Sequence, residues 1–472
     1  MLKLKSNIKY FCVAILFLLA TVGYAQSADA ILGFEEYLGY VKKYHPIARQ
    51  AQLTLSVGQA NLLKARGGFD PKIQVDYAKK EFKDTEYWDR LNATFKVPTY
   101  FGLEFKAGYE NYEGTYINPD ETVPEDGLYS AGVTMDVLQG FWANERMATL
   151  RKAKFFREQS KADQDILVNQ VLYDASLAYF NWLKAYEQAQ VYREFIESAR
   201  LRLEGVKKSA LAGDKAIIDT VEARITYQNR RLGLEQANLN FTKARLALSN
   251  YLWIENVPVE VQETAIPEEE ISQSLDVALD LLGKTKDSFA IENHPKYRSL
   301  DFKVKGLLVD KRLKGNKLLP KLTLEYNFLT SAVQDFETLN TQDYKGGLNF
   351  SFPLFLRKER GDLKLAKLKL QDAEFNRDFA QVSIQNKVEA IYAELDSYQN
   401  QVTMIDTIVL DYRTLLNAEE RKFGFGESSL FLVNSREGKL IDAQLKQIEM
   451  WNKYYTAKAD LFKSLAINPI NP

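Results

Sequence analysis

The sequence repeats one long pattern twice, and this duplication limits the possible folds more than any single residue does. A His-Pro pair at 45–46 is followed 25 residues later by Pro71 and a stretch that alternates apolar and polar residues. A second His-Pro pair at 294–295 is followed 25 residues later by Pro320 and a matching stretch. A duplication of this length predicts two similar structural units.

Each half continues into a second alternating stretch and then into a long helical stretch that ends at a glycine followed by an acid. The distance from Tyr129 to Gly213 is 84 residues, and the distance from Tyr344 to Gly426 is 82 residues. The two halves therefore share one plan of helix, strands and long helix, with the glycines at equivalent turns.

Residues 1–25 are typical of a secretory signal. Three lysines precede an apolar stretch over residues 11–20, and small residues precede a cleavage site after Ala25. The apolar stretch is shorter than a bilayer-spanning helix needs, and the alternative is a retained N-terminal anchor. The only cysteine, Cys12, lies in this segment, so the processed chain would have neither disulfides nor thiolate metal sites.

Composition excludes several functions. After removal of residues 1–25 the chain has 59 basic and 63 acidic residues, so nothing points to nucleic acid as a partner. No other segment has the 18 consecutive apolar residues typical of a transmembrane helix. A Gly-rich phosphate loop, an HExxH motif and a CxxC motif are all missing from the sequence, so we expect no enzyme, no cofactor and no metal site.

Six stretches alternate strictly between apolar and polar residues, four at about 72–138 and two at about 321–353. Their apolar members are Ile73, Val75 and Tyr77; Ala93, Phe95 and Val97; Leu103, Phe105, Ala107 and Tyr109; Tyr129, Ala131, Val133, Met135 and Val137; Leu322, Leu324, Tyr326 and Phe328; and Leu348, Phe350 and Phe352. Such strands form either a soluble sheet packed on an apolar partner or an outer-membrane barrel facing lipid. The secretory signal favours the barrel.

Loop lengths agree with a barrel. We expect long polar loops after the first strand of each half and over Asn111–Leu128, and a short connection over Pro98–Gly102. Outer-membrane barrels have long loops outside the cell and short turns on the periplasmic side.

Helical stretches make up the rest of the chain. Residues 28–66 and 276–315 are predicted as helices, each interrupted at its His-Pro pair. Ten apolar residues between Ile384 and Leu416 follow spacings of four and three, which is a heptad seam, and seven residues from Val168 to Ala189 repeat it. A helix over 358–423 would be roughly 100 Å long at about 1.5 Å per residue. Helices of this length must pair with the return helices that follow the glycine turns.

Six strands from one chain would leave two unpaired edges, and in lipid each lost hydrogen bond is costly. Several copies could close a barrel by joining their edges. We therefore expect a mixed α/β membrane protein in which an outer-membrane β-barrel is continued by a long α-helical coiled-coil barrel.

The two turn motifs carry a family resemblance, together with the duplicated plan and Leu318-Leu319-Pro320-Lys321-Leu322 before a strand. They read GDKAIIDTVEA from Gly213 and GESSLFLVNSRE from Gly426. The chain resembles the TolC-like outer-membrane efflux proteins over its whole processed length. That resemblance implies a homotrimer in outer-membrane lipid, a helical barrel in the periplasm of a Gram-negative bacterium, and docking to a periplasmic adaptor and an inner-membrane pump.

The resemblance also divides the chain. It implies a first repeat over 26–253, an inter-repeat equatorial segment over 254–275, and a second repeat over 276–472 that includes the C-terminal tail. The expected function is a passive conduit of a tripartite export system. The alternative is a periplasmic or surface coiled-coil scaffold or adhesin without a conducting pore.

Candidate aperture residues lie at the two turns: Gly213, Asp219, Glu222, Gly426, Leu432 and Ser435. Family members often have aspartates six and nine residues after the second glycine, where this chain has Leu432 and Ser435, whereas Asp219 fits the acidic pattern in the first half. We expect either an apolar constriction at Leu432 or simple packing of this leucine between neighbouring helices.

The first half contains an insertion. Pro71 to Tyr129 spans 58 residues, whereas Pro320 to Tyr344 spans 24. The usual plan of the family has four strands per chain. We expect six per chain and therefore eighteen per trimer, with a folded-in surface hairpin as the alternative.

Two further groups have structural explanations. Both histidines precede a proline at equivalent repeat positions, so we expect helix corners more than metal ligands. The Glu268–Glu270 run could resemble a metal site, but a solvated surface or the start of the next helix explains it better.

Overall fold

The computed structural model describes residues 31–334 and 340–467. The predicted secretory signal over residues 1–25 lies outside the described residues. The chain divides into two compact units, and each is described by itself. One contains residues 50–166 and 290–385, and the other contains the residues up to 49, residues 167–289 and those from 386 onward.

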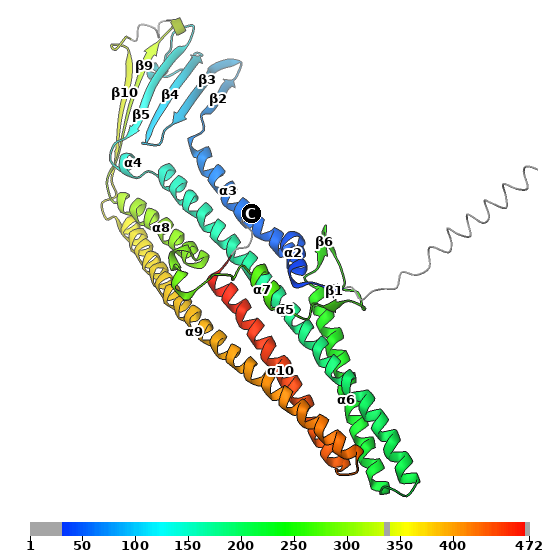
Figure 1. Ribbon diagram of the computed structural model, residues 1–472. Helices are drawn as coiled ribbons and strands as arrows, with labels where there is room; N and C mark the ends of the chain where they lie inside the picture. Colours follow the sequence, from blue (N-terminus) through cyan, green and yellow to red (C-terminus); the bar gives the residue numbers. More distant parts are fainter. Residues whose placement is uncertain (1–30, 335–339, 468–472) are drawn as a thin grey trace, which may run out of the picture. The chain divides into compact units, whose positions relative to one another are not determined.

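The first unit contains one antiparallel six-stranded sheet, whose strands lie side by side in Figure 1 in the order β10-β9-β5-β4-β3-β2. The strands are β2 (Lys72–Phe82), β3 (Thr85–Pro98), β4 (Leu103–Glu113), β5 (Leu128–Asp136), β9 (Lys321–Thr330) and β10 (Tyr344–Ser351). All six expected strands are present. The two inserted strands, β3 and β4, pair between β2 and β5 within the sheet and do not form a separate surface hairpin.

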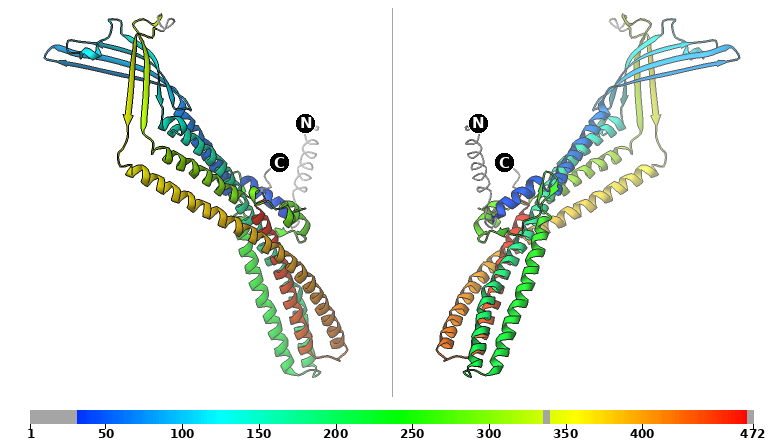
Figure 2. Two further views of the ribbon diagram at one scale, coloured as in Figure 1. Left: turned by 90° about the vertical axis from the view of Figure 1, so that its left-hand side faces the viewer. Right: turned by 90° about the vertical axis from the view of Figure 1, so that its right-hand side faces the viewer.

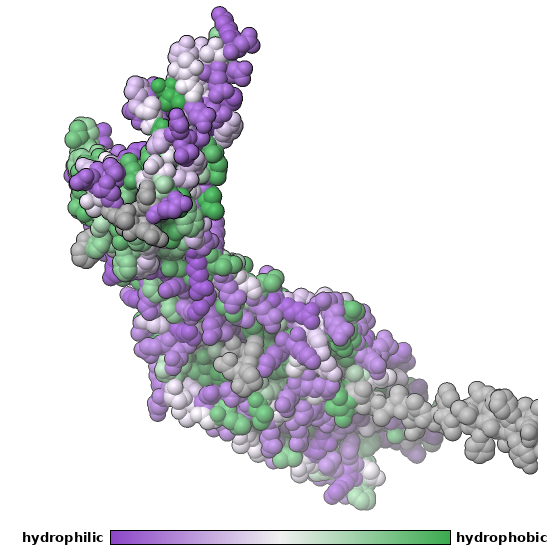
Figure 3. Space-filling model, turned by 90° about the horizontal axis from the view of Figure 1, so that it is seen from above, coloured by the Kyte–Doolittle hydropathy of each residue, from purple (hydrophilic) through white to green (hydrophobic). Residues whose placement is uncertain are grey.

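The register places the apolar residues of all six strands on one face. Ile73 lies opposite Phe95, Phe95 opposite Ala107, and Ala107 opposite Ala131. Among the described residues no second layer covers this face, and Ile73 is 78% exposed and Phe350 is 62% exposed. Seen from above, hydrophobic and hydrophilic residues both lie on the surface of the molecule (Figure 3).

The expected long loop after the first strand is wrong. β2 and β3 are joined by two residues, Lys83 and Asp84, with φ of +53° and +55°. Positive φ at both central positions is the geometry of a tight hairpin turn. The polar residues that suggested a loop pair across the strands instead, because Lys79 Nζ lies 2.6 Å from Glu86 Oε2.

Helices accompany the sheet in the first unit. The segments there are most of α3 (Pro46–Arg66), the 3-10 turns η1 (Gly67–Phe69) and η2 (Pro119–Glu121), α4 (Gln139–Trp142), the start of α5 (Glu145–Leu211), α8 (Pro295–Asn316) and the start of α9 (Arg357–Gly424). Residues 276–315 do not form the expected near-continuous helix. Asp280 and Gly283 have φ of +51° and +72°, which ends a helix, and the chain reaches α8 through two 3-10 turns.

The second unit is a bundle of long helices with small sheet pairs at one end. It contains α2 (Phe34–Tyr44), the later parts of α5 and α9, α6 (Ile217–Ser249), α7 (Ser272–Ala278), η3 (Lys286–Ser288), α10 (Leu430–Leu465), and the pairs β1 (Ile31–Leu32) with β8 (Ile266–Pro267) and β6 (Trp253–Ile254) with β7 (Val257–Pro258). The turn η4 (Ile291–Asn293) belongs to the first unit. In the described residues, every helix is too short or too polar to cross a membrane.

Both predicted heptad seams are confirmed. All seven residues of the α5 seam are buried, and the ten of the α9 seam are buried or half-buried while most of their neighbours are exposed. Val191 and Phe195 of α5, Val409 of α9, and Leu440 and Ile441 of α10 form one apolar cluster. Burial of each such side chain stabilises the bundle by about 1.5–3 kcal/mol.

An aromatic core joins α2, α5 and the inter-repeat segment. The ring of Phe34 lies 5.2 Å from that of Tyr179 and 5.3 Å from that of Phe180. The Tyr179 hydroxyl donates to the carbonyl of Leu32 at 2.6 Å and accepts from the amide of Glu268 at 3.1 Å. The polar tip of this tyrosine is therefore satisfied inside an apolar cluster.

Both histidines occupy helix corners. The Nδ1 atom of His45 accepts from the amide of Ile47 at 3.3 Å, and that of His294 accepts from the amide of Lys296 at 3.1 Å. Each side chain is buried and lies directly before a proline that begins a helix. The imidazole thus satisfies an amide that the first helical turn leaves without a partner.

Candidate functional site: the two helix turns

The first turn joins α5 to α6 through a left-handed glycine. Gly213 has φ of +87°. The amide of Asp214 donates to the carbonyl of Ser209 at 3.0 Å, and the amide of Gly213 donates to that of Ala210 at 3.2 Å. These bonds satisfy the last carbonyls of α5, and glycine adopts this conformation without a steric penalty.

The second turn repeats this geometry. Gly426 has φ of +77°, and the amide of Glu427 donates to the carbonyl of Lys422 at 2.9 Å. The next helix begins differently, because the Ser429 hydroxyl accepts from the amide of Leu432 at 3.3 Å, whereas α6 has no side-chain cap. Figure 2 shows the two helix turns at the same end of the bundle.

The predicted aperture residues lie close to the turns but do not form one cluster within a single chain. Asp219 and Glu222 are half-buried in the first turns of α6. Leu432 is 39% exposed and Ser435 is half-buried, whereas Val433 between them is buried in the bundle. Leu432 and Ser435 are three residues apart and therefore share a side of α10 outside the apolar core.

Large apolar side chains are exposed around both turns. They are Leu211, Ile217 and Ile218 at the first turn, and Phe425 and Phe431 at the second. Exposed apolar residues gathered at one end of a bundle are typical of a contact surface.

A buried ion cluster near the turns was missed in the sequence. Glu437 of α10 is fully buried, and its Oε1 accepts from Nε of Arg230 on α6 at 3.2 Å. Its Oε2 accepts from Arg202 of α5. Arg202 also donates to Asn434 at 3.0 Å, and Asn434 donates to Glu222 at 3.1 Å.

This cluster connects four helices, because Arg202 also lies 3.6 Å from Glu420 of α9. A buried carboxylate needs such partners, since an unpaired buried charge is strongly destabilising. The signal in the sequence was Glu437 itself, which occupies a seam position of α10 between Val433 and Leu440. Of the six predicted residues, only Glu222 contacts this cluster.

We expect Glu437→Gln to destabilise the bundle, because it leaves Arg202 and Arg230 without their shared carboxylate. Removal of one partner of a buried ion pair typically costs about 3–5 kcal/mol. Thermal unfolding of the detergent-solubilised protein would measure this as a lower midpoint. The control is Glu197→Gln, which removes an exposed ion pair with Arg200 on α5. Equal midpoints for both variants would contradict a stabilising cluster.

A second polar group lies where the inter-repeat segment meets α5 and α10. A cavity of about 380 Å³ is lined by Glu187, Glu269, Glu270, Ser272, Gln273, Trp451 and Tyr455. Burial, with a smaller contribution from Glu269, raises the pKa of Glu187 to about 7. Glu269 and Glu270 are exposed as expected, but Glu268 is not simply solvated, because it accepts from the amide of Phe34 at 3.2 Å.

Glu187 should make stability depend on pH. Its folded pKa of about 7 lies above its usual value of 4.5, so the folded state holds the proton more tightly than the unfolded state. The stabilisation that Glu187 contributes is therefore complete below pH 4.5 and is lost as the pH rises toward 7. The thermal midpoint of the wild type should fall between pH 4.5 and pH 7, and the fall should be smaller in Glu187→Gln. If the midpoint of the variant depended on pH as steeply as that of the wild type, groups other than Glu187 would be responsible for the pH dependence.

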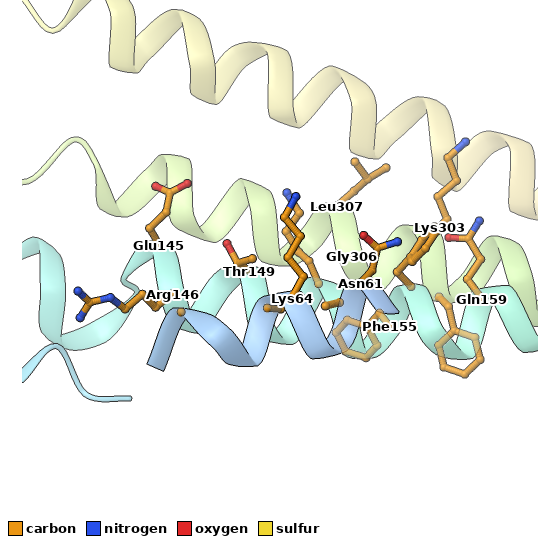
Figure 4. A pocket seen from close by; sticks show the side chains of 16 residues that line it. Asn61, Lys64, Glu145, Arg146, Thr149, Phe155, Gln159, Lys303, Gly306 and Leu307 are labelled. Carbon is orange, nitrogen blue, oxygen red and sulfur yellow. The ribbon is translucent and has the colours of Figure 1, made fainter. Parts of the chain in front are cut away.

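Another cavity, within the first unit, does not resemble a catalytic site. Its volume is about 620 Å³, and its walls come from α3, α5 and α8 (Figure 4). Phe155, Phe156, Phe302 and Leu307 provide apolar surface, and Lys64 and Lys303 lie among the polar lining residues. This lining has no nucleophile paired with a base, and it is an apolar helix surface open to a further packing partner.

Comparisons with known proteins agree with this geometry. Residues 288–466 match the family described as outer membrane efflux protein, which confirms the predicted resemblance in the second half. No curated protein matches the chain by sequence.

Solved structures share the fold over nearly the whole chain. They include the CmeC outer membrane channel of Campylobacter jejuni, with a TM-score of 0.62 and 15% identity over 92% of this chain and 85% of that one. The open state of the MtrE outer membrane channel of Neisseria gonorrhoeae has a TM-score of 0.65 and 13% identity, over 92% of this chain and 88% of that one. The outer membrane protein VceC of Vibrio cholerae has a TM-score of 0.62 and 12% identity, over 92% of this chain and 96% of that one.

Proposed function

We propose that this protein is an outer-membrane efflux channel, the passive conduit of a tripartite export system. Three copies form the channel, with the strands in outer-membrane lipid and the long helices in the periplasm. The family match over the second half and the fold shared with outer membrane channels support this function. The copy number follows from the resemblance to the TolC-like proteins, and the closure of the barrel is inferred from the unpaired edges of the sheet.

The observation that carries the proposal is the two-faced sheet. Large apolar side chains on one face are exposed on five of the six strands, those of β5 are half-buried, and the other face is polar. A soluble sheet would bury the apolar face against another layer, but the described residues provide no such layer. Lipid on one side and water on the other satisfy both faces.

The sheet edges require further copies. Within the part of the chain that the structure describes, β2 is paired only on its β3 side and β10 only on its β9 side, and every residue of both strands is exposed. Each unpaired backbone group in hydrocarbon costs several kcal/mol. Pairing β2 of one copy with β10 of the next removes both edges and closes a barrel of eighteen strands in a trimer.

The helices supply the periplasmic duct. The apolar surface between α3, α5 and α8 would be covered by a neighbouring copy in a helical barrel. The exposed apolar residues at the two helix turns suit docking of a periplasmic adaptor, through which the inner-membrane pump would deliver its cargo.

A scaffold or adhesin without a pore is the competing function. The coiled-coil helices would suit it, but a scaffold has no need for a sheet with one lipid-compatible face and one polar face. Trimer mobility on gels and conductance in liposomes separate the two.

Cysteine pairs should join copies through the sheet edges. The chain without its signal has no cysteine, so Gln74→Cys on β2 combined with Gly347→Cys or Asn349→Cys on β10 introduces the only thiols. We expect oxidation to give linked dimers and trimers for at least one pair, because disulfides form only when the Cα atoms lie within about 7 Å. Thr94→Cys on the interior strand β3, paired with the same partners, should give none. A monomeric product from every β2–β10 pair would contradict the edge-to-edge barrel.

Leu432→Asp should change ion selectivity if Leu432 forms an apolar constriction. A carboxylate there would attract cations, so we expect stronger cation selectivity and block by divalent cations in single-channel recordings. Leu432→Asn is the matched uncharged variant and should change conductance without cation selectivity. Identical selectivity and block in the wild type and Leu432→Asp would mean that this leucine only packs between helices.

A further inference from the structure

The polar face of the sheet has a row of lysines. Direct strand partners run from Lys72 on β2 to Lys96 on β3 and Lys106 on β4. The same line continues through two uncharged residues to Lys345 on β10. We call Lys72, Lys96, Lys106 and Lys345 the lysine row. Of the six positions along this line, one on each strand, four are cationic and none is acidic.

This arrangement has a cost. Like charges placed directly opposite each other on neighbouring strands destabilise a sheet. The row places three lysines opposite one another on three successive strands, with no intervening acid. Stability of the sheet therefore does not explain the row.

Only half of the row is neutralised. Lys106 Nζ lies 3.1 Å from Glu325, and Lys345 Nζ lies 3.9 Å from Glu110. Among the described residues, no acidic oxygen lies within 4.0 Å of Lys72 or Lys96. Glu104 lies diagonally across from Lys96 on the same face, but it is already paired with Arg146 at 2.9 Å. Asp76 is four residues along β2 from Lys72, which is about 13 Å and beyond the screening length of roughly 8 Å at physiological salt.

The row crosses the whole height of the sheet. Lys72 is the first residue of β2, next to the preceding helix, whereas Lys345 is the second residue of β10, next to the β9–β10 loop. A hollow of about 150 Å³ on the polar face is lined by Lys96, Lys106 and Lys345 together with Glu110 and Glu325, the two acids that pair with Lys345 and Lys106. Gly132 lies in the middle of the line, where a Cβ atom would come within 2.1 Å of the Tyr326 carbonyl, so this position stays open.

We infer that the lysine row makes the barrel lumen selective for anions, so that the exported substrates are small molecules carrying carboxylate, sulfonate or phosphate groups. This inference rests on the proposed function, because the polar face lines a passage only when the sheet closes. A diagonal line of cations inside a low-dielectric wall concentrates anions and gives them successive weak sites from the periplasmic end to the outside.

Planar-bilayer recordings across a KCl gradient test the inference. We expect the wild-type reversal potential to show a preference for chloride over potassium. Lys72→Gln combined with Lys96→Gln should reduce the chloride-to-potassium permeability ratio about two- to fivefold, since the two unneutralised charges supply most of the field. The control is Lys79→Gln, on the opposite face of β2 and paired with Glu86, and it should leave the ratio unchanged.

A second measurement works even when the periplasmic end is shut. Binding of pyranine, a trisulfonated dye, to the detergent-solubilised assembly should weaken several-fold in the double variant and remain unchanged in Lys79→Gln. Cation-selective wild-type conductance, or equal dye binding in all three proteins, would overturn the lysine row as an anion path. A complete lack of conductance together with a monomeric protein would instead overturn the proposed channel, and the inference with it.

Discussion

The unpaired edges of one sheet determine how this protein can exist in a membrane. β2 and β10 each have a row of backbone donors and acceptors that no other strand among the described residues satisfies. In water such edges lead to aggregation, and in hydrocarbon they are prohibitive. The long helices, the duplicated turns and the exposed apolar surfaces are all consistent with a chain that completes its structure only beside copies of itself.

The duplication is visible in atomic detail as well as in the sequence. Gly213 and Gly426 have the same left-handed conformation and the same pair of capping bonds, and both histidines cap a helix through Nδ1. The halves differ where packing requires it. Only the second half has the Ser429 cap, and only α10 has the buried Glu437, whose two arginine partners come from the first half.

Much of the fold could be predicted because its periodicities are long and regular. Strict alternation identified six strands, and spacings of four and three identified the seams on α5 and α9 that are buried in the structure. The hairpin between β2 and β3 was missed because its polar residues pair across the strands, which no local pattern reveals. The break after α7 depends on positive φ at Asp280 and Gly283, residue types that adopt positive φ more readily than most but do not require it. The partners of Glu437 come from residues more than 200 positions away, so only the structure could bring them together.

The two inserted strands have a geometric consequence for the width of the assembly. Neighbouring strands lie about 4.8 Å apart, so β3 and β4 add roughly 10 Å of perimeter to each copy. The helical part has no corresponding insertion, since each half contributes one long helix and one return helix. In a closed assembly the outer mouth would therefore be wider than the helical neck, and the neck would set the size limit for what can pass.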